Sequence, residues 1–292
     1  MRKRNKNHFP PYWQLTKPII TLSVSFSALA GYILYSGGFT GHWFSMYLGV
    51  LLVAAGSSAL NQIQESDMDR KMKRTRSRPL PSGRLSMMQA SVFTMLLIAA
   101  GTTLLAIRNG TVPMTLALVT LMWYNGIYTP LKRFSPWAVI PGALVGAIPP
   151  VIGWTAAGGW LFHHDIAFII FFFFTGQIPH FWLILLRHGD DYQKAGFPSI
   201  TNTFSPPQIH RLTFSWTATT ALTAIMLPLF DVITGYITGG AIITLSATLV
   251  IWFYVSVKKD FNVNRAFFIT NIYFLFMMLL IMADALLRPM LY

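Results

Sequence analysis

Apolar segments of about 20 residues are the feature that most limits how this chain can fold, because a helix of that length spans the hydrocarbon core of a bilayer. A helix in lipid also closes its own backbone hydrogen bonds. The sequence is 54% hydrophobic and 11% charged. It contains about nine such segments, at residues 18–36, 44–65, 88–107, 112–129, 137–157, 166–187, 212–230, 238–257 and 266–287. Because the connections are short, we predict an all-α polytopic membrane protein with one domain over residues 1–292, of which 1–16 form a basic tail.

The basic residues gather on one side of the predicted membrane. If the segments alternate in direction, all but Arg108 and Arg288 of the 22 lysine and arginine residues fall on the same side as the N-terminus. Basic residues in short loops favour the cytoplasm. The N-terminus is therefore predicted to be cytoplasmic and the C-terminus to be outside. Topology accounts for the net charge of +13, which gives no reason to expect nucleic acid as a partner.

A polar cluster ends the second apolar segment, where Asn61, Glu65 and Asp69 recur every four residues. On a helix these side chains share one face, and their oxygens can converge on one cation. Oxygen ligands suit Mg²⁺, which keeps part of its coordination shell for water and phosphates. The basic run that follows, residues 70–84, would alone be an ordinary topology signal or a contact with anionic membrane lipid. Acids at the end of an apolar span are costly and usually functional, so a site for a magnesium-bound diphosphate is favoured over a solvated loop.

Two further polar stretches lie at predicted cytoplasmic ends of segments. Asp190 and Asp191 are adjacent and repel each other unless a cation lies beside them. A second metal ion and a solvated turn are both open interpretations there. Tyr128, Lys132 and Arg133 offer donors to phosphate oxygens, although tyrosines in such places often only anchor a helix at the interface.

Four other features lie outside these polar stretches. His180, inside the sixth segment, is interpreted equally well as a packing residue or as a contact for an acceptor substrate. His163-His164-Asp165 resembles a metal cluster, but it lies in a predicted external loop, where a solvated turn is the favoured interpretation. Asp284 has no assigned role and is expected at the membrane interface. Gly142-x-x-x-Gly146 predicts a close approach of a neighbouring helix.

The polar stretches resemble the UbiA superfamily of intramembrane prenyltransferases. The first signature is matched by Asn61-Gln-x-x-Glu65-x-Asp67-x-Asp69-x-x-Met72-x-Arg74-Thr75-x-x-Arg78-Pro79-Leu80-Pro81-x-Gly83. Residues 128–133, 146–154 and 179–198 are similar to the branch of the superfamily that farnesylates heme, and they follow in the same order. Lys17-Pro18 near the start also fits.

The resemblance implies a helix bundle around a central cavity, in a bacterial cytoplasmic (inner) membrane, with the rim of the active site facing the cytoplasm. It implies Mg²⁺-dependent transfer of a farnesyl group from farnesyl diphosphate to a vinyl group of heme B. The metal ligands would be Asn61, Glu65 and Asp69, with Asp190 and Asp191 as candidates for a second ion. Catalysis would use the first three residues and Lys132. Diphosphate would be bound by Arg74, Arg78, Tyr128, Lys132 and Arg133, and the acceptor side would include His180, Trp182 and Tyr192.

The sequence departs from the family pattern in ways that bear on the acceptor. Many members carry a second Asp-x-x-x-Asp motif, whereas Lys194 stands four residues after Asp190. Thr175-Gly-Gln177 and Pro198-Ser-Ile-Thr also differ from the heme branch. A quinone precursor or another aromatic acceptor is therefore the nearest alternative. An ion-coupled transporter is less favoured, because transporters usually hold ions near the bilayer midplane, and the motif pairs of CDP-alcohol phosphotransferases are missing.

Overall fold

The chain folds into a helical bundle, described by a computed structural model for residues 10–196, 198 and 203–291. The side chains of 190, 192, 194 and 289–291 are outside this description. Helices are the only regular secondary structure in the described residues, which confirms the all-α prediction. The elements are α1 (Pro11–Thr16), α2 (Pro18–Ser36), α3 (Trp43–Gln64), α4 (Ser66–Lys71), α5 (Met87–Asn109), α6 (Thr111–Met122), the π-helical turn η1 (Trp123–Tyr128), α7 (Thr129–Leu131), the 3₁₀ turn η2 (Pro136–Ala138), α8 (Val139–Ala147), α9 (Pro149–Ala156), α10 (His164–Lys194), α11 (Pro206–Leu229), α12 (Tyr236–Lys259) and α13 (Val263–Leu291).

Eight helical spans within the described ranges are long and apolar enough to cross a membrane. Seven of the nine predicted segments correspond to single helices among them, and the segment at 137–157 is formed by η2, α8 and α9 together. The segment at 112–129 is helical from Thr111 to Leu131, but η1 interrupts its α-helix, and it is not one of the eight. The chain is therefore an integral membrane protein. The count of about nine and the cytoplasmic N-terminus stay predictions.

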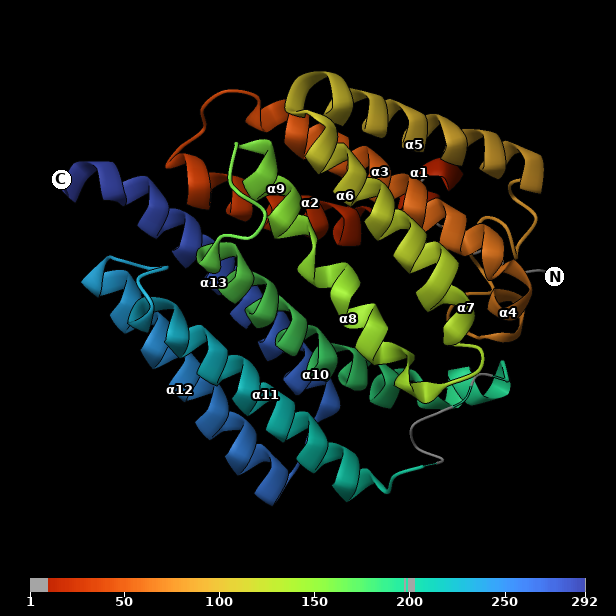
Figure 1. The fold of residues 1–292 in the computed structure, drawn as a ribbon. Helices are drawn as coiled ribbons and strands as arrows, with labels where there is room; N and C mark the ends of the chain where they lie inside the picture. The colour runs from red at the N-terminus through yellow and green to blue at the C-terminus, as the bar shows by residue number, and fades with distance from the viewer. Residues whose placement is uncertain (1–9, 197, 199–202, 292) are drawn as a thin grey trace.

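The bundle buries one long core and leaves apolar side chains on its outside. Figure 1 shows the long helices lying side by side. The core includes Ile33 of α2, Met46 of α3 and Phe172 of α10, all buried. Large apolar side chains such as Ile19 and Ile237 are exposed, with 82% and 91% of their surface accessible. In a bilayer such side chains face lipid and carry no penalty.

The last residues of the predicted basic tail are not a free tail. Residues 11–16 form α1, and its Leu15 is fully buried. The side-chain amide of Gln62 on α3 donates to the carbonyl oxygens of Gln14 and Leu15, each at 3.0 Å. Lys17 follows in a left-handed conformation (φ 48°) and separates α1 from α2. Such a conformation turns the chain sharply, and Pro18 can begin α2 because the first residue of a helix needs no donor.

Gly142 and Gly146 leave room for side chains of neighbouring elements, Tyr128 of η1 and Gln177 of α10, which an added methyl group would meet at 2.7 and 2.5 Å. Direct contact between helix backbones occurs at other glycines. Gly153 of α9 lies against the backbone of α2 at Ala28, and Gly31 of α2 lies against the backbone at Pro150. Pro149 and Pro150 have no backbone N–H with which to continue the hydrogen bonds of α8, and a separate helix, α9, begins at Pro149.

Asp284 has a structural role. Its carboxylate is 2% exposed and accepts the backbone N–H groups of Thr234 (3.2 Å) and Gly235 (2.8 Å) just before α12. Arg288, one turn further along α13, forms an ion pair with it at 3.1 Å. The acid is thus buried with partners, in agreement with the rule that buried charges are paired, and it ties the loop before α12 to α13.

Candidate active site

The three residues of the first acidic cluster are held one turn apart across a break in the helix. Helix α3 ends at Gln64, and Glu65 (φ −105°, ψ 5°) connects it to α4. The backbone hydrogen bonds nevertheless continue, from Glu65 N–H to the Asn61 carbonyl (3.0 Å) and from Asp69 N–H to the Glu65 carbonyl (2.8 Å). The three residues therefore lie one helical turn apart, as their four-residue spacing predicts, although α3 and α4 are separate helices. All three side chains are buried and line the same cavity.

Each acid of this cluster is paired with a base that also lines the cavity. Asp69, fully buried, accepts a charge-assisted hydrogen bond from Arg78 Nη1 at 2.7 Å through Oδ2. Glu65 forms an ion pair with Lys132 Nζ. Buried charges need such partners because desolvation of a lone charge costs several kcal/mol. The sequence predicted acids for a metal and bases for phosphate, and the structure places the two groups in direct contact.

The other carboxylate oxygen of Asp69 is the one most available to a metal ion. Oδ1 is buried and has no hydrogen-bond partner among the described residues. A buried acceptor without a partner costs about 1–3 kcal/mol. Together with the Glu65 carboxylate and the Asn61 amide oxygen, Oδ1 forms a set of possible metal ligands that are all oxygen atoms, and such a set fits Mg²⁺.

Lys17 is a further cation at this site. Its Nζ donates to Asn61 Oδ1 at 2.9 Å, and the Asn61 amide donates to Thr129 Oγ1 at 3.2 Å. Burial is the main cause that lowers the pKa of the Lys17 ammonium to about 7, and the neighbouring Arg78 and Lys132 lower it further, against the opposing effect of Glu65 and Asp69. A bound anion would favour the charged form of this lysine.

A cavity of about 380 Å³ extends from these polar residues into the bundle. This volume lies within the range of about 300–1,000 Å³ that is usual for small-molecule sites. One end is lined by the acids and bases already described and by Arg74. The remainder is lined mainly by apolar and small residues of α2, α3, α6, α8, α9 and α10, such as Val24, Val53, Ala117 and Ile152.

Aromatic side chains form the wall next to the polar end. The rings of Tyr124 and Tyr128 are stacked with centroids 5.6 Å apart, and Phe181 lies 5.7 Å from Tyr128. Lys132 Nζ is 5.5 Å from the centre of the Tyr128 ring. The π-turn η1 brings Tyr124 and Tyr128 to the same side of the helix, and both line the cavity. Ring faces carry partial negative charge and can stabilise a cation.

The second acidic stretch, Asp190 and Asp191, contacts the basic run that follows the first acidic cluster. Residues 190–191 belong to the end of α10 rather than to a loop. The Asp191 carboxylate accepts the backbone N–H of Arg74 at 3.2 Å, and it is not among the residues that line the cavity. The side chains of Asp190 and Tyr192 lie outside the described residues. In Figure 1 this end of α10 lies on the same side of the molecule as α4 and α7.

Three other predicted residues differ in where they lie. His180 lines the cavity, and its ring is 5.1 Å from that of Phe267. Trp182 is buried in a separate apolar cluster with Val139 and Ile209 and does not line the cavity. Arg133 does not line it either. Its guanidinium donates to the Gln64 carbonyl. This carbonyl is in the last turn of α3, where carbonyl groups have no partner within the helix.

A network of polar residues that the sequence did not single out lies beside the site, and of its members only Ser57 lines the cavity. Asn125 in η1 accepts from Ser57 Oγ at 2.7 Å and donates to the Ser57 carbonyl at 3.1 Å. Its amide also donates to Gln64 Oε1 at 3.2 Å. A polar residue inside an apolar segment is a signal that could have identified Ser57 and Asn125, but the partner on the other helix was not visible in the sequence.

The fold and the site define a class of protein: a membrane-embedded helical enzyme with paired acids and bases at one end of an apolar cavity. The sequence matches the UbiA prenyltransferase family over residues 24–280. It is 42% identical over 219 residues to the protoheme IX farnesyltransferase of Geobacter sulfurreducens, covering 74% of this chain and 80% of that protein. It is 40% identical over 194 residues to the enzyme of that name from Cytophaga hutchinsonii, covering 65% and 67%.

Solved structures agree on the fold. A UbiA homolog from Archaeoglobus fulgidus bound to GPP and Mg²⁺ superimposes with a TM-score of 0.69 at 16% identity, over 94% of this chain and 99% of that one. A structure from work on digeranylgeranylglyceryl phosphate synthase gives a TM-score of 0.77 at 14% identity, over 94% and 98%. The chain belongs to the UbiA prenyltransferase family and is a prenyltransferase.

Proposed function

We propose that this chain transfers the farnesyl group of farnesyl diphosphate to a vinyl group of heme B, giving heme O. The observation that carries the chemistry is the buried Asp69 Oδ1, which has no hydrogen-bond partner among the described residues, at the cation-lined end of an apolar cavity. The choice of heme as acceptor is supported by the protoheme IX farnesyltransferases at 36–42% identity. We place the polar end of the cavity at the cytoplasmic face of a bacterial inner membrane.

The polar end of the cavity is assigned to the metal and the diphosphate. Mg²⁺ would be held by Asn61, Glu65 and Asp69, and when bound it neutralises charge on the leaving diphosphate. The bases in contact with these ligands, together with Arg74, bind the oxygens of the same group: Lys17, Arg74, Arg78 and Lys132. Such fixed charges act where charge develops, which is usually the largest catalytic contribution. Arg133 is assigned to holding the end of α3, and Asp191 to positioning the backbone of Arg74.

The apolar part of the cavity is assigned to the prenyl chain and the acceptor. When the bond between the allylic carbon and the diphosphate oxygen breaks, positive charge develops beside Tyr124, Tyr128 and Phe181, whose ring faces stabilise it. The heme vinyl group supplies the electron pair for the new carbon–carbon bond. Water then adds to the resulting cation and loses a proton, giving a hydroxyethylfarnesyl group. His180 lies on this wall and is assigned to the acceptor side, whereas Trp182 is assigned to packing.

The test of the function is a reaction with purified components. The chain in detergent micelles is incubated with heme B and farnesyl diphosphate, with Mg²⁺ or with excess EDTA, and products are identified by mass spectrometry. We expect heme O only in the presence of Mg²⁺. Transfer to an aromatic acceptor such as a quinone precursor, with none to heme, would keep the reaction type and overturn the acceptor. Magnesium-independent transfer would overturn the metal assignment.

Lys17→Met is expected to raise the KM for farnesyl diphosphate by more than about tenfold, since a hydrogen bond to a charged group contributes about 1.5–3 kcal/mol. Methionine is unbranched like lysine, one atom shorter and uncharged, and it must adopt the same left-handed backbone conformation that lysine adopts, so the fold should persist. Lys71→Met, at an exposed position of α4, is the matched control and should leave KM unchanged. An equal KM in both variants would remove Lys17 from the diphosphate site.

A further inference from the structure

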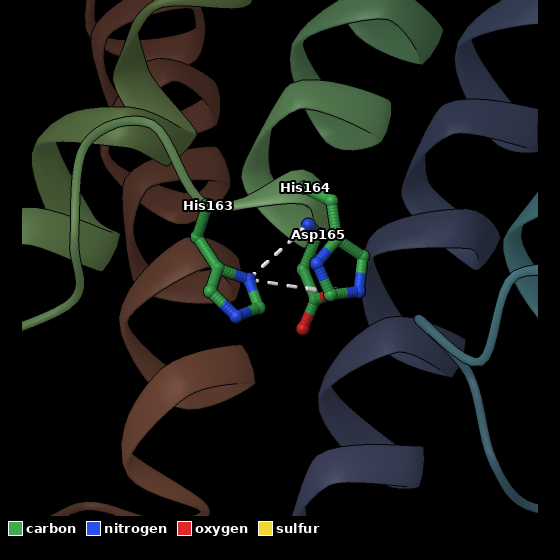
Figure 2. Close-up of side chains that lie close together, drawn as sticks. All are labelled: His163, His164 and Asp165. Atoms are coloured by element: carbon green, nitrogen blue, oxygen red, sulfur yellow. Dashed lines mark hydrogen bonds and ion pairs between the residues drawn. The ribbon is translucent and has the colours of Figure 1, made fainter.

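A second cluster of metal-binding side chains lies at the opposite end of α10. His163, His164 and Asp165 begin this helix (Figure 2), and each offers a ligand atom within 4.8 Å of the other two. Asp165 and Asp191 are 26 positions apart on α10, which corresponds to about 40 Å at 1.5 Å per residue. The cluster is therefore far from the diphosphate end of the cavity and has no part in the proposed reaction.

The distances in this cluster suit a tetrahedral ion. His164 Nε2 lies 2.8 Å and His163 Nδ1 lies 3.6 Å from the same oxygen, Asp165 Oδ1. Ligands at about 2.0–2.1 Å from zinc in a tetrahedral site are about 3.3 Å apart. The two distances fall on either side of this value, so small side-chain rotations, above all of the exposed His164, would bring the three ligand atoms into place.

His163 also caps the start of α10 through its ring nitrogen. His163 Nδ1 accepts the backbone N–H of Asp165 at 3.3 Å, so in this arrangement that nitrogen presents a lone pair. It also faces the carboxylate oxygen of Asp165, another acceptor. Two acceptors facing each other repel unless a cation or a proton lies between them. The long hydrogen bond to the backbone is weak, so its loss on metal binding would cost little.

The surroundings hold His163 in position. Its ring packs on Trp154 of α9, with centroids 5.5 Å apart. Trp154 is 3% exposed, and its indole N–H donates to the Trp160 carbonyl at 3.0 Å. The His164 ring is stacked on the His163 ring at 4.4 Å, and its side chain is 65% exposed. One histidine is thus anchored and the other remains accessible to a metal ion from solution.

The helix start acts against a cation, but only slightly. The positive end of a helix dipole disfavours a positive ion by about 0.3–1 kcal/mol at an exposed site. The Asp165 carboxylate in the first turn offsets this effect. Two imidazoles and one carboxylate are the donors preferred by zinc and its neighbours in the first transition series, whereas Mg²⁺ and Ca²⁺ prefer oxygen alone.

We propose that His163, His164 and Asp165 bind a divalent transition-metal ion of the zinc type at the start of α10, at the face opposite the diphosphate end. The site has three protein ligands and an open position for water. It is independent of the Mg²⁺ site in both ligand chemistry and place.

The experiment is a zinc titration of the purified full chain carrying no polyhistidine tag, followed by calorimetry in saturating Mg²⁺. We expect one zinc ion per chain, and binding weakened more than about tenfold in His164→Ala, since even the loss of an outer-shell partner costs about 10–100-fold. His164 is exposed, so this variant should fold. His163→Ala should behave in the same way.

Two controls separate this site from others. His42→Ala removes a histidine that contacts Arg108 rather than the cluster, and it should leave zinc affinity unchanged. Asp69→Asn removes a ligand of the proposed Mg²⁺ site and should also leave it unchanged. Zinc affinity that survives His164→Ala, or that falls equally in His42→Ala, or an absence of binding to the unaltered chain, would overturn the proposal.

Discussion

Replacing Asp69 with asparagine is expected to reduce kcat/KM for prenyl transfer by more than about 100-fold, the usual effect of removing one preorganised charge-stabilising group. The substitution keeps the shape of the side chain and removes its negative charge. It replaces one of the two carboxylate oxygens with an NH2 group. The remaining oxygen accepts from Arg78, so the NH2 group stands in place of Oδ1, which has no hydrogen-bond partner among the described residues, and an NH2 group cannot bind the proposed magnesium ion. Steady-state kinetics with farnesyl diphosphate and heme B would measure the loss.

The fold should survive this change, although a buried ion pair is lost. Removing one partner of a fully buried pair costs about 3–5 kcal/mol, but Arg78 is 23% exposed and can turn toward water. Thermal unfolding in detergent checks this. Asp67→Asn, on the same short helix but exposed, is the matched control and should keep full activity. Normal turnover by folded Asp69→Asn would exclude Asp69 as a metal ligand.

The helices were predictable because each apolar segment is about as long as a bilayer core is thick, and in lipid such a segment must form its backbone hydrogen bonds within itself, as a helix does. The first segment was predicted at residues 18–36 and the helix is Pro18–Ser36. The ends of other segments were less certain because polar residues can extend a helix beyond the apolar region, as α10 does through residues 188–194. The π-turn around Asn125 could not be predicted, since it depends on contacts with Ser57 and Gln64 on another helix.

Some features of the candidate site are likewise local in the sequence, and others depend on packing between distant segments. The four-residue spacing of Asn61, Glu65 and Asp69 is a local pattern, and the structure brings all three to one cavity. Which base meets which acid is set by packing between segments far apart in sequence, as for Glu65 with Lys132. Lys17 fits the family pattern as part of Lys17-Pro18, but the sequence alone assigns it no role at the site. Its position depends on the left-handed turn between α1 and α2, and a single lysine before an apolar segment looks like an ordinary topology signal.

The sequence did not predict the backbone contact between α2 and α9, and a substitution at this contact is expected to have a large effect on stability. Gly153→Ala would place a methyl group far inside contact distance of the Ala28 carbonyl oxygen and 2.8 Å from the backbone nitrogen of Tyr32. These neighbours are backbone atoms, so the two helices must separate. Overpacking costs about 1–3 kcal/mol and occasionally more. We expect the unfolding midpoint in detergent to fall by about 5–10 °C, at about 2–4 °C per kcal/mol for a chain of this size.

A glycine elsewhere in the bundle distinguishes this crowding from a general effect of alanine. Gly240 of α12 has no atom within 4 Å of an added methyl group, so Gly240→Ala should leave the midpoint unchanged or raise it, because alanine favours a helix by about 1 kcal/mol over glycine. Gly31→Ala crowds the same crossing through the backbone at Pro150. Once one substitution has separated the helices, the second has less to disrupt, so the double variant should lose less stability than the two single losses combined. Full additivity, or a midpoint for Gly153→Ala equal to that of Gly240→Ala, would show that α2 and α9 are not in backbone contact.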